Sequence, residues 1–114
     1  MAAWKVTIRN GSNVQRKGFD DLDEALSEAE RQTREILAEG ALPPARAFRE
    51  YEPSMLVKAR IEISGKGLIR PPTAGVDIQG DQSLVGFIGG VRRKPIEAHD
   101  EAGIFDEIRK ALSG

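Results

Sequence analysis

Between residues 20 and 40 the side chains that favour burial recur every three or four positions, a spacing that lines up one face of an α-helix. The stripe consists of Leu22, Ala25, Leu26, Ala29, Thr33, Ile36 and Leu37. Asp20 or Asp21 can cap the first turn, and Gly40 with the two prolines that follow it prevents continuation. The pattern predicts a helix from Asp21 to Glu39, about 30 Å long at a rise of 1.5 Å per residue.

Alternating patterns of period two, which are typical of half-buried β-strands, lie on both sides of this helix. A first strand is predicted from Trp4 to Arg9, followed by a turn at residues 10–13 and a return strand from Val14 to Gly18. Beyond the helix, residues 45–52 are interpreted as an edge strand or irregular arm. Two further strands are predicted to point these side chains inward: Met55, Val57, Ala59, Ile61, Ile63, Ala74, Val76 and Ile78.

The segment from Leu84 to Val91 is apolar at both odd and even positions, so as a strand it needs cover on both faces. It is either central beneath packed layers or half of an interface with a second copy of the chain. The candidate interface residues are Leu84, Val85, Phe87, Ile88 and Val91. A short amphipathic helix from Glu101 to Ser113, with Asp100 as its cap, is predicted to end the chain.

Together these elements predict one α+β domain spanning residues 1–114. The expected order is two strands, a long helix, three or four strands and a short helix, with both helices on one face of an antiparallel sheet of about five or six strands. The sequence contains no apolar run of about 20 residues and no cysteine. We therefore expect a soluble, cytoplasmic protein with no membrane segment.

Charge is divided unevenly along the chain. Residues 20–39 carry eight acidic and two basic side chains, a net of −6, whereas the whole chain has a net charge of −1 and the remainder therefore +5. If the helices cover one face of the sheet, basic side chains project from the other face, and further ones lie at a strand end. The candidate contacts for nucleic acid or another polyanion are Lys5, Arg9, Lys58, Arg60, Arg92, Arg93 and Lys94.

A plainer interpretation of this basic face is solubility, since ordinary protein surfaces mix charges at about this density. Glu62 and Asp77 also dilute the positive charge. Single-strand binders use aromatic stacking platforms, but only 5% of this chain is aromatic. None of the following is expected at an outward strand position: Trp4, Phe19, Phe87 and Phe105.

Few residues are candidates for catalysis or for binding a metal or a phosphate. His99 is the only histidine, and its polar surroundings favour an exposed linker residue over a catalytic base. Asp77 and Asp81 flank a predicted turn, but they are too few for a calcium site. The glycines between Gly86 and Gly90 lie in a predicted strand rather than before a helix, which excludes a phosphate loop. We therefore assign no catalytic, cofactor or metal residues.

Three functions remain open. The first is a noncatalytic binding or protein-interaction module with an unknown protein partner, forming a homodimer through Leu84–Val91. The second is binding of nucleic acid or another polyanion by the basic face. The third is an enzyme acting through carboxylates, or through residues from both subunits of a dimer, for which a deep pocket with a perturbed acid beside His99 would be needed.

Overall fold

The computed structural model describes residues 3–40, 56–66, 71–90 and 92–113. Within these ranges it contains one antiparallel sheet of six strands in the order β2-β1-β3-β4-β5-β6, together with two helices. The strands are β1 (Trp4–Asn10), β2 (Asn13–Phe19), β3 (Val57–Gly65), β4 (Thr73–Gln79), β5 (Leu84–Ile88) and β6 (Lys94–Pro95), and the helices are α1 (Leu22–Ala38) and α2 (Glu101–Ser113). The predicted α+β class and element order are confirmed.

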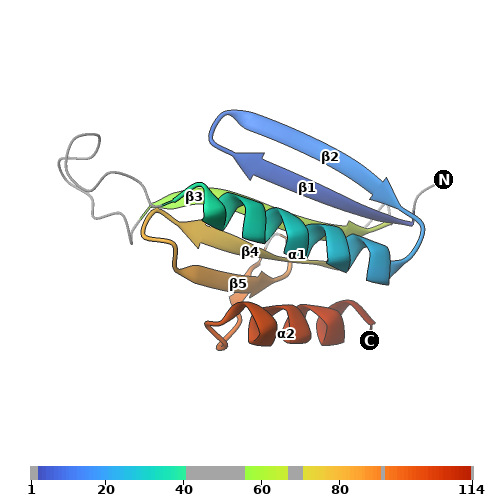
Figure 1. Cartoon of the computed structure of the whole chain (residues 1–114). Helices are drawn as coiled ribbons and strands as arrows, with labels where there is room; N and C mark the ends of the chain where they lie inside the picture. Colours follow the sequence, from blue (N-terminus) through green and yellow to red (C-terminus); the bar gives the residue numbers. More distant parts are fainter. Residues whose placement is uncertain (1–2, 41–55, 67–70, 91, 114) are drawn as a thin grey trace.

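Both helices lie on the same face of the sheet (Figure 1). Helix α1 packs on β1 and β3, and α2 packs on β4 and β5 beside α1. The core fills the space between these layers. It comprises Val6, Ile8, Ala59, Ile61, Ile63, Ala74, Val76, Ile78 and Leu84 from the sheet, Ile96 just after β6, and Ala25, Leu26, Ala29, Ile36, Ile104, Phe105, Ile108 and Leu112 from the helices.

Both ends of α1 follow the predicted capping pattern. The Asp21 carboxylate accepts a hydrogen bond of 2.8 Å from the Glu24 amide at the first turn. After the last turn, Gly40 has a φ of +94°, a left-handed conformation that glycine adopts without steric cost. Asp100 likewise accepts a hydrogen bond from the Gly103 amide at the start of α2. The local sequence therefore sets these helix ends.

A β-bulge in β3 overturns one expectation. The register shifts between Val57 and Ala59, so Lys58 is an extra residue and the alternation is interrupted. Val57, predicted to point inward, is 49% exposed. The Lys58 side chain, predicted to project from the face opposite the helices, instead reaches the C-terminal end of α1, where it donates to the carbonyls of Ile36 and Gly40 at 3.0 and 2.7 Å.

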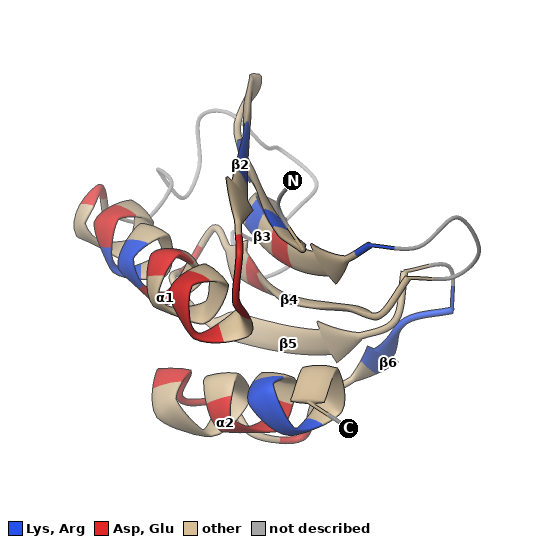
Figure 2. Cartoon of the chain, turned by 90° about the vertical axis from the view of Figure 1, so that its right-hand side faces the viewer, with Lys and Arg blue, Asp and Glu red and all other residues tan. Residues whose placement is uncertain are grey.

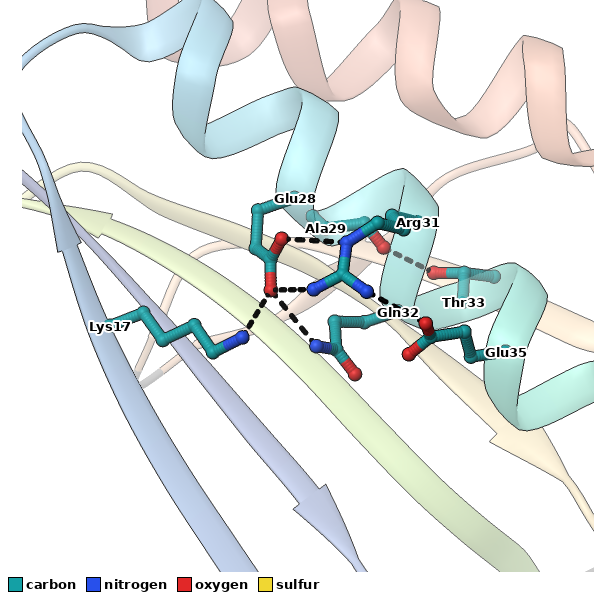
Figure 3. A network of polar contacts seen from close by, with 7 residues as sticks. All are labelled: Lys17, Glu28, Ala29, Arg31, Gln32, Thr33 and Glu35. Carbon is teal, nitrogen blue, oxygen red and sulfur yellow. Dashed lines mark hydrogen bonds and ion pairs between the residues drawn. The ribbon is translucent and has the colours of Figure 1, made fainter.

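A polar network joins α1 to the edge strand β2 (Figure 3). The Glu28 carboxylate accepts hydrogen bonds from Lys17 at 2.6 Å and Gln32 at 2.9 Å, and it pairs with Arg31 at 2.7 Å. Burial alone would raise the pKa of Glu28, but the hydrogen bonds from Gln32, Lys17 and Arg31 outweigh it and lower the pKa from 4.5 to about 2. Glu28 is therefore held as an anion beneath the hairpin.

Two predicted features fall outside the described residues. The edge strand or arm at 45–52 and the inward position of Met55 both lie there.

Candidate functional site: the open face of the sheet

Side chains that point away from the helices form the open face of the sheet. Strand pairing aligns Thr7 with Arg16 on one side and with Glu62 on the other, and Glu62 with Gly75 and then Phe87. A neighbouring row of aligned residues runs from Val14 through Arg9, Arg60 and Asp77 to Val85. Because directly opposed residues share one face, these rows define the surface.

The strand register places more basic than acidic residues on this face, whereas the two helices carry more acidic than basic residues (Figure 2). The open-face cations are Lys5, Arg9, Arg16, Arg60 and Arg93. The acids placed there by the register are Glu62 and Asp77, which leaves an excess of three positive charges among the described residues. The fold thus separates the charges as predicted, with a positive excess on the open face and a negative excess on the helices.

Each of the two acids is already engaged by an arginine. Arg60 donates to both Asp77 oxygens, with its Nη2 at 2.9 Å from Oδ2, and this hydrogen bonding raises the pKa of the Arg60 guanidinium. Arg93 donates to Glu62 at 3.3 Å. Glu62 and Asp77 therefore neutralise only Arg93 and Arg60. Among the residues that the structure describes, no acid pairs with Lys5, Arg9 or Arg16.

Phe87 lies on the open face in β5, next to the edge strand β6, contrary to the expectation that it takes no outward strand position. Its alignment with Gly75 places it opposite the helices, yet it is only 4% exposed. The Arg60 and Arg93 guanidinium carbons lie 5.5 and 4.7 Å from its ring centroid, which is the range of cation–π contacts. Gly75 leaves room for the ring, because a Cβ there would come within 2.7 Å of the Phe87 Cζ atom.

The structure brings together four of the seven predicted polyanion contacts: Lys5, Arg9, Arg60 and Arg93. The other three lie elsewhere. Lys58 caps α1, Lys94 is aligned with Ile88 in the row that faces the helices, and Arg92 borders a cavity beside the end of α2. Sequence reasoning missed Arg16, although extending the strand register of the predicted hairpin places it opposite Thr7 on the same face.

Contacts within a single chain explain why β5 is apolar on both faces. Leu84, which is 8% exposed, belongs to the core, and the partly buried Ile88 packs against it. On the other face, Phe87 is covered by Arg60 and Arg93. Of the candidate interface residues that the structure describes, Val85 is the one with a substantially exposed side chain, at 36%. Val91 lies outside the described residues. A homodimer through this strand stays a prediction.

The residues considered for other chemistry have structural roles or are exposed. Asp81 accepts hydrogen bonds from the Ser83 hydroxyl and amide, which lower the pKa of its carboxyl and hold the turn between β4 and β5. His99 is exposed between β6 and α2. In the described ranges no cluster of three or more His, Asp or Glu side chains is arranged to hold a metal ion.

Comparison with protein-family models, with curated protein sequences and with solved structures gave no significant match. Neither described helix is long and apolar enough to cross a membrane. The functional argument therefore depends on the open face itself.

Proposed function

We propose that this chain is a noncatalytic binding module that binds single-stranded nucleic acid or a similar flexible polyanion across the open face of its sheet. The observation that carries the proposal is the excess of cations there, with Lys5, Arg9 and Arg16 unpaired among the described residues and the acidic helices on the opposite side. Such a distribution orients a polyanion toward one face of the protein.

The width of the sheet favours a single strand over a duplex. Six strands spaced about 4.8 Å apart span roughly 24 Å, whereas the major groove of B-DNA is about 12 Å wide. A flexible strand can instead lie across the sheet, where its phosphates meet Arg9 and Arg16. Its bases can stack on the guanidinium planes above Phe87, since arginine planes serve as stacking surfaces for unpaired bases.

Salt dependence and charge removal test this proposal. We expect a fluorescently labelled thymidine oligonucleotide to bind at about 50 mM salt and to lose affinity as salt rises to about 200 mM, because phosphate contacts release counterions. Arg9→Gln should weaken binding several-fold and reduce the magnitude of the slope of log K against log salt by about 0.7. The matched control is Arg34→Gln, which removes the same charge from α1, where Arg34 pairs with Glu101.

Two results would contradict the proposal. One is no binding at low salt, and the other is an equal loss of affinity in Arg9→Gln and Arg34→Gln, which would indicate a response to net charge alone.

Self-association is a second candidate function, favoured by the opposite charges of the two faces. The acidic surface of α1 in one copy is complementary to the open face of another. Sedimentation of the nucleic-acid-free protein distinguishes this from polyanion binding. Oligomers at low salt that dissociate as salt rises would support self-association, and a monomer at both salt concentrations would exclude it.

A further inference from the structure

A cavity of about 420 Å³ opens at the end of the sheet where β1 begins and where β2 and β3 end. Basic residues from each of these segments border it, together with the sole tryptophan and a serine. They are Trp4, Lys5, Arg16, Lys17, Ser64 and Lys66. No carboxylate is among the described residues that line the cavity.

Strand pairing brings these side chains to one place. Lys5 is aligned with Gly18 in β2 and with Ser64 in β3. Just after β3, the amide of Lys66 donates to the carbonyl of Ala3 at 3.2 Å, which holds Lys66 beside the start of β1. Residues distant in the sequence thereby share one cavity wall.

The cations differ in how far they are already neutralised. Lys17 lies 2.6 Å from the Glu28 carboxylate, so its charge is balanced on the helix side. Lys5, Arg16 and Lys66 form no ion pair with a described residue. The cavity therefore presents three uncompensated positive charges and the Ser64 hydroxyl, which can donate one hydrogen bond.

We propose that this cavity binds a phosphate monoester, the group found at the end of a nucleic-acid strand and in free nucleotides. A monoester carries a charge of about −1.5 to −2 near pH 7 and offers three strong acceptor oxygens, whereas a diester within a strand carries one negative charge. Three cations around a small cavity without a described carboxylate favour the more highly charged group. The inference extends the proposed function, since Lys5 and Arg16 belong to both surfaces, but small phosphates test it independently.

Trp4 supplies a direct readout, because it lines the cavity and is the only tryptophan. With selective excitation of the indole, adenosine 5′-monophosphate should change the emission and bind about ten-fold tighter than the 3′,5′-cyclic monophosphate, a diester with one charge less. Lys66→Gln should abolish most of this preference. Arg34→Gln, which removes a cation on α1 outside the cavity lining, should retain it.

Equal affinity for the two nucleotides, or a full preference in Lys66→Gln, would overturn the inference. Oligonucleotides then separate the inference from the proposed function. A 5′-phosphorylated strand that binds tighter than its 5′-hydroxyl counterpart, with the advantage lost in Lys66→Gln, would support a strand end as the ligand. Strand binding without any monoester preference would overturn the cavity assignment and leave the proposed function standing. Monoester binding without strand binding would support the cavity assignment and overturn the proposed function.

Discussion

Replacing Lys58 by methionine should lower the free energy of unfolding by about 2 kcal/mol. The Lys58 side chain is 9% exposed, and its ammonium donates to the carbonyl of Ile36 in the last turn of α1 and to that of Gly40 just after the helix. The last turn of α1 contains no basic residue, so the charge that complements its negative end comes from β3. Methionine retains an unbranched stem of similar length but removes the charge and both hydrogen bonds.

The magnitude follows from two losses and one effect that offsets them. Hydrogen bonds that involve a charged group contribute roughly 1.5–3 kcal/mol each, and a cation at a helix C-terminus contributes about 0.3–1 kcal/mol. The variant no longer has to desolvate an ammonium, which offsets part of this loss. Gln82 continues to donate to the carbonyl of Leu37 at 2.7 Å, and the Glu39 amide continues to donate to the carbonyl of Ile36 at 3.1 Å, so the helix end keeps these partners. A net loss of about 2 kcal/mol should lower the melting temperature by about 8 °C in a domain of this size.

Urea unfolding followed by circular dichroism is the appropriate assay. The midpoint should fall with no change in the slope m, because the same surface is exposed on unfolding. Lys94→Met is the matched control, since Lys94 is exposed in β6 and forms no ion pair with a described residue. If Lys58→Met and Lys94→Met have the same midpoint as the wild type, the assignment of Lys58 as a helix-capping residue is wrong.

Two further predictions concern the Glu28 network and the packing of Gly75 against Phe87 on the open face. The lowered pKa of Glu28 means that its ion pairs stabilise the fold above about pH 4.5 and that this contribution is lost as the pH falls toward about 2. Glu28→Gln should therefore be less stable than the wild type by about 1–2 kcal/mol near pH 6, a range reduced because Lys17 and Arg31 are partly exposed. The difference should vanish near pH 2 in melting curves recorded across this range, and a pH-independent difference would contradict the assigned pKa. Gly75→Ala should destabilise the protein by about 3 kcal/mol or more, because a Cβ would lie 2.2 Å from the Ile61 carbonyl oxygen as well as against Phe87. Gly90→Ala, whose Cβ would meet nothing closer than 3.8 Å, should change the melting temperature little, and equal effects of the two glycine substitutions would refute the packing described for Gly75.

The elements that the sequence predicted well are those whose signal is local. The apolar stripe of α1, the cap at Asp21 and the left-handed Gly40 all depend on residues within one or two turns. The same holds for α2, which spans Glu101–Ser113 as expected. Alternation also predicted the inward positions of Ala59, Ile61 and Ile63.

The errors occur where a distant segment decides the position of a side chain. Lys58 lies in an alternating run, and the bulge that turns it toward α1 becomes evident only when β3 pairs with β4. Phe87 was not expected at an outward strand position. It is buried on the open face instead, where Gly75 makes room and two arginines cover the ring.

The sequence by itself determined the fold class, the helix ends and the division of charge between helices and strands, because periodicity, capping and charge can be seen over short stretches. Only the tertiary structure decided which cations share a surface. Strand order and register place Arg9 beside Arg60 and bring Lys5 and Ser64 together across more than fifty residues of sequence. Pairing between distant strands is the physical source of both the open face and its terminal cavity, and no local pattern encodes it.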